Sequence, residues 1–205
     1  MYSGGQVSFQ SGWKDGATVF DTPQLSAVYD EAEISVNAPL FIIVPEEFFD
    51  ASRAAEALAS AVRLPEGADV EYAEIPEYKA FMVYSLPCGE NISGVIATSV
   101  SLKDAGPVKV MPEAWYVVRD LSAIDQYNKI SASYIEGKLY LAVAQGDDLL
   151  LCNVFDAPDF TTAQYYIFMV LNKLQINRVQ SSVRFRSPLE EDWEISLGKY
   201  FKAVL

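Results

Sequence analysis

The 205-residue chain contains no histidine and only two cysteines. Without histidine, Ser–His–Asp and Cys–His catalysis are excluded, and so are ordinary zinc sites. The cysteines, Cys88 and Cys152, lie far apart and do not have the spacing of metal ligands. Cys152 falls inside the apolar run Leu149–Phe155, where we expect a buried and unreactive thiol.

Basic residues and long apolar runs are also scarce. The chain has 15 Lys and Arg against 28 Asp and Glu, a net charge of −13. This balance repels phosphate backbones, so nucleic acid is not an expected partner. The longest apolar runs, Pro39–Pro45 and Tyr165–Leu171, are much shorter than the roughly 20 residues that span a bilayer. Because Met1–Gln6 also lacks the features of a signal peptide, we expect a cytoplasmic protein without membrane insertion.

The first half of the chain predicts several strands and two helices. With 51% hydrophobic residues, the chain can bury a substantial core. The run Pro39–Pro45 is β-branched and bounded by prolines, which predicts one fully buried strand. Asp50 is placed to cap an alanine-rich helix over Ala51–Leu64. A second helix is expected over Glu113–Gln126, while Ile92–Leu102 fits a strand or a helix equally well. The other predicted strands are Val7–Phe9, Ala17–Phe20, Ala32–Asn37, Val70–Ile75, Ala80–Leu86 and Val108–Met111.

The second half has a clearer pattern, in the order βββαβα. The three predicted strands are Ile130–Glu136, Lys138–Gln145 and Leu149–Phe155, joined by turns that contain Gly137 and Gly146.

The rest of this half is predicted as helix, strand and helix. Asp159 or Thr161 is expected to cap the helix Thr162–Leu174, which is apolar nearly all round and so either buried on most sides or part of an interface. The strand Val179–Phe185 follows, and Ser187–Glu190 then fits a capping box for a last helix over Leu189–Val204.

A βββαβα unit used twice is the plan of the actin-like, ribonuclease-H-like superfamily, and the order of elements in the first half is compatible with a second copy. We therefore expect an α/β fold of two such lobes, residues 1–128 and 129–205, with mixed sheets flanked by helices. Four segments resemble an uncharacterised Bacteroidetes family, a domain of unknown function with a reduced actin-like ATPase fold. They are Leu40–Phe49, the hairpin around Glu136-Gly137-Lys138, the helix Tyr165–Leu174 and the ending Leu197–Tyr200.

The resemblance implies nucleotide binding between the two halves. The superfamily's ATPases bind phosphates with Asp-x-Gly hairpins, and carboxylates near these turns hold the metal. The matching turn of the second half is Glu136, Gly137 and Lys138, which would be the cofactor-binding residues if ATP and magnesium bind, but it lacks the Asp-x-Gly. The nearest candidates in the first half are Ser3-Gly4-Gly5-Gln6 and Asp15-Gly16, and Arg184–Pro188 replaces the expected glycine-pair loop. No Walker A or G-x-G-x-x-G motif substitutes for them.

Other groups of residues have both a functional and a structural interpretation. Asp147-Asp148 with Asp156 and Asp159 would suit a metal site, but turn residues and helix caps are the favoured interpretation. Arg184 and Arg186 should face the same side of their strand and are expected to pair with acidic side chains rather than bind an anion. Glu46-Glu47 and Glu190–Asp192 are interpreted in the same structural way, the latter as charges at a helix N-terminus. Four aromatic residues are expected in the core rather than on a binding surface: Trp115, Tyr116, Tyr165 and Tyr166.

Two functional hypotheses follow. The first is a non-catalytic scaffold or adaptor without a cofactor, which binds an unknown protein partner through an actin-like fold that has lost its phosphate loops. The alternative is a divergent ATPase whose phosphate contacts come mostly from the backbone. A ribonuclease-H-like nuclease is discarded, because it needs acidic residues on the first strand of the sheet and Val7–Gln10 and Ile130–Ile135 contain none.

Overall fold

The computed structural model describes residues 27–87 and 108–205, together with residues 2–3, 6–7, 14, 23 and 101–102. The first two short strands, β1 (Tyr2–Ser3) and β2 (Gln6–Val7), pair antiparallel. A second short pair, β3 (Val28–Tyr29) and β8 (Ser101–Leu102), is parallel. Apart from Val7, Ser101 and Leu102, the predictions for Val7–Phe9, Ala17–Phe20 and Ile92–Leu102 lie outside the described residues.

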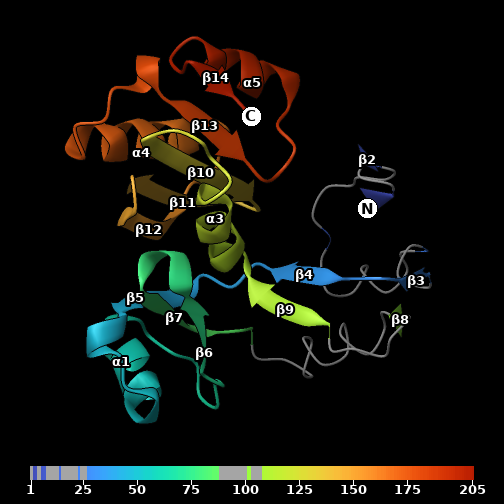
Figure 1. The fold of residues 1–205 in the computed structure, drawn as a ribbon, viewed down its shortest axis with the longest axis vertical. Coiled ribbons are helices and arrows are strands. Elements are labelled where there is room, and N and C mark those ends of the chain that lie inside the picture. Colours follow the sequence, from blue (N-terminus) through green and yellow to red (C-terminus); the bar gives the residue numbers. More distant parts are fainter. Residues whose placement is uncertain are drawn as a thin grey trace.

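A five-stranded mixed sheet forms the second half of the molecule (Figure 1). The order of its strands is β12-β11-β10-β13-β14, with antiparallel β10–β11 and β11–β12 pairs and parallel β10–β13 and β13–β14 pairs. Their bounds are β10 Asn128–Ile135, β11 Lys138–Gln145, β12 Asp148–Asp156, β13 Ser182–Phe185 and β14 Ala203–Val204. The predicted α/β architecture is confirmed, and so is the order βββαβα in this half.

The last helix is shorter than predicted. α5 spans Glu191–Gly198 instead of Leu189–Val204, and β14 follows it. The predicted capping box is also wrong, because α5 begins after Glu190 without a side-chain cap, and the hydroxyl of Ser187 accepts the backbone N–H of Tyr134 at 3.1 Å. Backbone hydrogen bonds to β13 compete with continuation of the helix. In these bonds Phe185 donates to Leu205 at 2.8 Å, and Leu205 donates to Val183 at 2.9 Å.

One face of this sheet packs against α4 (Phe160–Lys173) and α5. Side chains alternate along the strands, so Ile130 and Ala132 of β10 face this side together with Leu139 and Leu141 of β11. Ile167 and Leu171 of α4 are fully buried against them. Tyr165, on the same helix, is 61% exposed, so α4 has one solvent face and is not buried all round.

Asp159 is the residue that caps α4, since its carboxylate accepts the N–H of Thr162 at 2.7 Å. Hydrogen bonds from the backbone and the side chain of Thr162 hold the pKa of Asp159 below its usual range. The contribution of the cap to stability is therefore fully present above the ordinary carboxyl pKa of about 3.9 and is lost as pH falls through the lower, folded-state value.

Replacing Asp159 by alanine should lower the melting temperature most at neutral pH, because the carboxylate is then fully ionised. The difference from wild type should shrink in strong acid. Melting followed by circular dichroism across this pH range measures it. A difference that stays constant from neutral to strongly acidic pH would show that the charge of Asp159 does not stabilise the helix.

The opposite face of the sheet packs against α3 (Glu113–Leu121), as Figure 1 shows. Small residues line this face where the helix crosses it: Ser131, Ser133, Ala142 and Ala144. They leave room for Val117, Val118 and Leu121, all fully buried. The predicted helix Glu113–Gln126 is confirmed at its start but ends five residues early. Met82 and Tyr84, from a separate three-stranded sheet, pack into the same hydrophobic cluster.

That smaller sheet belongs to a module, which we call the α1 module (residues 40–85), below the five-stranded sheet in Figure 1. Its strands β5 (Leu40–Pro45), β7 (Ala80–Ser85) and β6 (Glu71–Ile75) form an antiparallel sheet in that order, and α1 (Ala54–Ala61) packs on one face. β5 is an edge strand, so the prediction that it is fully buried is wrong. The central strand is β7, which pairs on both sides and has five buried residues.

The α1 module connects two strands that pair with each other. β4 (Glu33–Val36) runs parallel to β9 (Lys109–Pro112), one on each side of the module in the sequence. Asp50 caps the 3-10 turn Ala51–Arg53 before α1, as its carboxylate accepts the N–H of Ser52 at 2.9 Å. Among the described residues, none of the helices has the length and apolar character that a membrane-spanning helix needs.

Candidate functional site

The turn between β10 and β11 contains the three residues predicted to bind a cofactor. Glu136 and Gly137 have φ angles of 46° and 75°, and Ile135 pairs with Lys138. This is the two-residue hairpin with positive φ at both central positions, which glycine adopts without strain. The carbonyl of Gly137 accepts the N–H of Ala157 at 2.8 Å, which ties the turn to the end of β12.

The side chains of this turn bind other parts of the protein. The Glu136 carboxylate accepts a hydrogen bond from Nδ2 of Asn37 at 3.2 Å, and Lys138 forms an ion pair with Asp156. Asn37 also accepts the hydroxyl hydrogen bond of Tyr140 at 2.6 Å. The structure thus connects the predicted site residues to Asn37, just after β4, a contact that the sequence did not indicate.

Gly137→Ala should destabilise the protein by about 1–2 kcal/mol, because an alanine in left-handed backbone is strained by that amount. The added Cβ would lie 3.6 Å from the carbonyl oxygen of Ala157, an ordinary contact, so the cost comes from φ. Gly198→Ala is the matched control, since Gly198 lies in α5 and an added Cβ there would meet no neighbouring element within 4 Å. It should be neutral or slightly stabilising. Urea denaturation of both variants tests the difference, and equal effects would contradict a strained turn.

A network of charged side chains lies where α3 meets the end of β13. We call it the Glu113–Arg186 network; its members are Ser35, Glu113, Asp120, Arg184 and Arg186. The Glu113 side chain is only 1% exposed. It accepts a hydrogen bond from Nε of Arg186 at 3.1 Å and another from the Ser35 hydroxyl. Nη1 of Arg186 donates to Asp120 at 2.9 Å.

The prediction for the two arginines is confirmed. Both reach Asp120, Arg184 through Nε at 3.8 Å and Arg186 through the closer hydrogen bond. They therefore share one side of the chain and pair with carboxylates. Burial alone would lower the pKa of Arg186, but Glu113 and Asp120 outweigh it and raise that pKa overall. Arg186 is committed as a cation to these two partners.

The position of the two carboxylates on α3 explains why the cation is needed. Glu113 is the first residue of the helix, where negative charge is favoured by the helix dipole, but Asp120 lies in the last turn, where it is disfavoured. The neighbouring guanidinium groups of Arg184 and Arg186 offset this cost. The sequence predicted acidic partners for the two arginines but did not indicate which ones, since the Arg186–Glu113 contact joins residues 73 positions apart.

Three successive residues of β4 contact α3, one of them through the Ser35–Glu113 hydrogen bond already described. The Ser35 hydroxyl bonds Glu113, the hydroxyl of Tyr116 donates to the carbonyl of Ile34 at 3.2 Å, and Arg119 contacts Glu33 at 2.5 Å.

Burial raises the pKa of Tyr140, and the charges of Glu113 and Glu136 raise it further. Tyr140 therefore interacts electrostatically with Glu113 of the network and with Glu136 of the hairpin turn.

The remaining candidates are mostly structural. Asp156 pairs with Lys138 and Asp159 caps α4. In the described part of the chain no group of three or more Asp, Glu or Cys side chains is arranged to hold a metal ion. Burial raises the pKa of the Cys152 thiol, in agreement with the predicted unreactive cysteine.

Of the four aromatic residues expected in the core, Tyr116 is buried and Trp115 packs partly against it. Tyr166 is partly buried and stacks on Phe155 at 4.8 Å. Tyr165 is 61% exposed, so the prediction is wrong for that residue. Tyr165 lies on the solvent face of α4. The sequence does not show which face that is, because apolar residues occupy every side of the helix.

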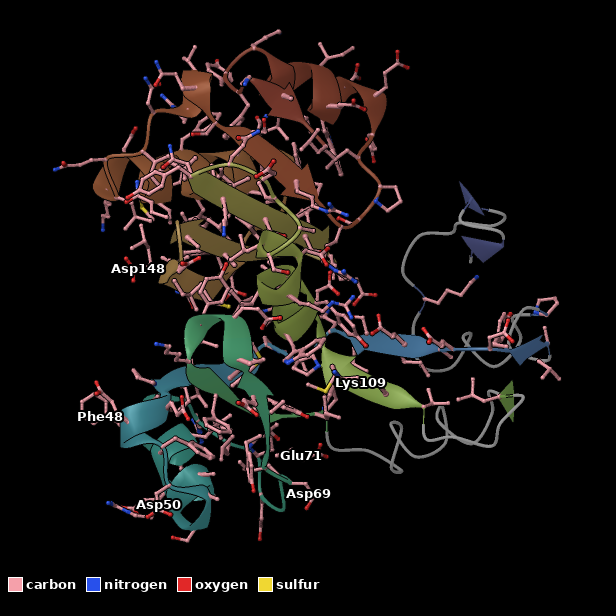
Figure 2. The ribbon with its side chains drawn as sticks, in the orientation of Figure 1. Phe48, Asp50, Asp69, Glu71, Lys109 and Asp148 are labelled. Atoms are coloured by element: carbon pink, nitrogen blue, oxygen red, sulfur yellow. The ribbon has the colours of Figure 1, made fainter. Side chains whose placement is uncertain are left out.

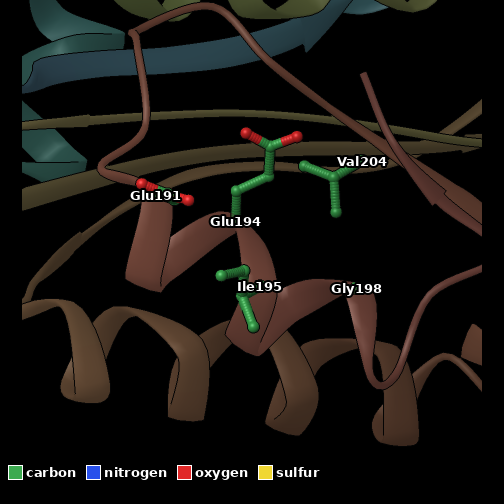
Figure 3. Close-up of a pocket in the computed structure, with 5 residues that line it drawn as sticks. All are labelled: Glu191, Glu194, Ile195, Gly198 and Val204. Carbon is green, nitrogen blue, oxygen red and sulfur yellow. The ribbon is translucent and has the colours of Figure 1, made fainter.

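A pocket at the outer surface is shown in Figure 3. It lies beside α5 and β14 and is lined by Glu191, Glu194, Ile195, Gly198 and Val204. It shares no residue with the hairpin turn or with the Glu113–Arg186 network. Its carboxylates belong to the first turn of α5, where they complement the helix dipole.

The overall fold is similar to the actin-like ATPase fold of a solved structure. A solved structure from Bacteroides thetaiotaomicron, described as a protein with actin-like ATPase fold and unknown function, matches with a TM-score of 0.66. The match covers 92% of this chain and 72% of that chain at 15% sequence identity. Residues 8–204 match the family described as "Protein of unknown function (DUF3822)", and the chain belongs to that family. The predicted resemblance is confirmed. No curated protein matches.

Proposed function

We propose that this protein is a non-catalytic, protein-binding scaffold built on an actin-like ATPase fold. The observation that supports it is the Glu113–Arg186 network, in which the buried Glu113 and the neighbouring Asp120 bind Arg186 at the end of β13. This is the place where the superfamily's glycine-pair loop is expected before the last helix. In this chain Arg186 follows β13 at that point in the sequence, and its charge is already paired with the carboxylates of Glu113 and Asp120.

The electrostatics of the network disfavour a nucleotide. A phosphate approaching Arg186 would also approach Glu113 and Asp120, and like charges in a partly buried site repel strongly. Releasing Arg186 to a phosphate would leave Glu113 buried and uncompensated, which costs about 3–5 kcal/mol. The hairpin turn also lacks the Asp-x-Gly, and its Glu136 carboxylate accepts a hydrogen bond from Asn37.

A divergent ATPase is the second candidate, and the turn itself favours it. Gly137 has a positive φ, the backbone conformation that a tight phosphate-binding turn can use, and the resemblance points to this turn. Backbone amides bind phosphate without any side-chain signature. We favour the scaffold because the charged side chains around this turn are mostly acidic or already paired.

A thermal-shift titration separates the two. The scaffold predicts that millimolar ATP or ADP, with or without magnesium, leaves the melting temperature unchanged, because a ligand stabilises only the state that binds it. The Arg186→Met variant is measured alongside, since a shift that depends on Arg186 would locate the nucleotide at the network. A saturable, magnesium-dependent shift in the wild type would overturn the scaffold proposal.

The composition of the chain supports a proposal for its location and for the kind of partner it binds. The net charge of −13 supports a protein partner over nucleic acid. We propose a cytoplasmic location on the composition of the chain.

A further inference from the structure

The α1 module carries nearly half of the net charge of −13 of the chain. Residues 40–85 contain nine Asp and Glu against three Lys and Arg, a net charge of −6. Residues 128–205, which form the five-stranded sheet and its outer helices, contain nine acidic and eight basic residues. The smaller module therefore carries the stronger negative field, and its partner should be basic.

A pocket opens on this module between the 3-10 turn Glu46–Phe48 and α1. Its apolar lining comes from Val44, Phe48, Phe49, Ala54 and Ala57. The rest of its lining is polar or charged and consists of Asp50, Arg53, Glu56 and Ser60. A large apolar side chain would contact both hydrophobic and charged groups there.

Phe48 is the most unusual residue of this surface, because its large apolar side chain is 72% exposed. Figure 2 shows Phe48 and Asp50 at the outer side of the module, away from the five-stranded sheet. The neighbouring Phe49 turns inward and stacks on Phe81, with ring centroids 4.0 Å apart and nearly parallel planes. Tyr72 is 48% exposed, and its ring centroid lies 5.0 Å from that of Phe49, so it extends the aromatic surface.

The surface is built rigidly. The Phe49–Phe81 stack fixes the backbone beside Phe48, and the bond from Ser52 to Asp50 fixes the start of the helical segment. Glu46 and Glu47 are exposed, and neither forms an ion pair within the described part of the chain. Rigid aromatic residues with few free torsions lose little entropy when they are covered, which suits them as anchors of an interface.

We infer that this surface is the docking site for a basic segment of a partner protein, which places one large apolar side chain in the pocket beside Phe48 and its Lys or Arg side chains near Glu46, Glu47 and Asp50. The inference rests on the proposed scaffold function and names the chemistry of the partner. Phe48 supplies contact area, and the carboxylates supply orientation and a faster encounter.

The experiment selects a phage-displayed library of random peptides on the immobilised wild-type protein. We expect enriched peptides with an excess of Lys and Arg around a large apolar residue. Synthetic versions should bind the Phe48→Ser variant at least about tenfold more weakly, as expected for loss of an interface anchor. The double variant Glu46→Lys/Glu47→Lys should also weaken binding, and added salt should weaken binding to the wild type.

Tyr127→Ser is the matched control, because Tyr127 is 71% exposed and lies outside the module. It should bind the peptides as the wild type does, and all variants should keep the wild-type melting temperature. The inference is overturned by peptides without basic excess, by peptides that bind Phe48→Ser unchanged, or by a failure to enrich any. A nucleotide-dependent thermal shift would instead overturn the scaffold function and leave these peptide results as they are.

Discussion

Replacing Arg186 by methionine is expected to lower the free energy of unfolding by about 3–5 kcal/mol, the usual cost of removing one partner of a buried ion pair. The variant keeps most of the side-chain volume but leaves Glu113, 1% exposed, without its cation. Asp120 loses its closest partner too, at the end of α3 where the helix dipole already disfavours negative charge. Urea denaturation followed by tryptophan fluorescence measures the change.

Two further variants show whether the loss comes from the buried charge. Arg184→Met removes a neighbouring guanidinium that is 41% exposed and 3.8 Å from Asp120, so it should cost less than about 1 kcal/mol. Glu113→Gln, added to Arg186→Met, removes the uncompensated charge and should recover a large part of the loss. If Arg186→Met cost no more than Arg184→Met, the network would not be the structural link between α3 and β13.

The second large effect is expected in the core under α4. Leu171→Ala should lower the free energy of unfolding by about 3 kcal/mol, because Leu171 is fully buried and its truncation leaves a cavity. Tyr165→Ala, on the exposed face of the same helix, should change it by less than about 0.5 kcal/mol. Chemical denaturation of the pair tests which face of this apolar helix packs on the sheet. Equal losses would mean that Tyr165 is covered, as in a self-associated form.

The second half of the fold was predictable because its signals are local. A glycine marks the two-residue turn between β10 and β11. The cap at Asp159 likewise lies next to the helix that it begins. Where local patterns fit two structures, the prediction failed. Leu197 and Phe201 suit a helix, yet backbone bonds to β13 end it and form β14.

The site was less predictable than the fold. The resemblance pointed to Glu136, Gly137 and Lys138, and the hairpin is where it was expected. Glu113 was not identified, because a glutamate at the start of a helix is common and only a contact 73 residues away shows that it is buried with Arg186. β5 was assigned as a buried strand for a similar reason, since an apolar run does not tell an edge strand from a central one.

The most direct test of the scaffold function is an amide NMR titration of the wild-type protein with ATP and magnesium. We predict that the signals of Gly137, Lys138 and Arg186 do not move as the nucleotide reaches millimolar concentration, because the charged groups at the end of β13 are bound to one another. Saturable shifts at these three amides would contradict the scaffold function and would assign this fold a nucleotide-binding role.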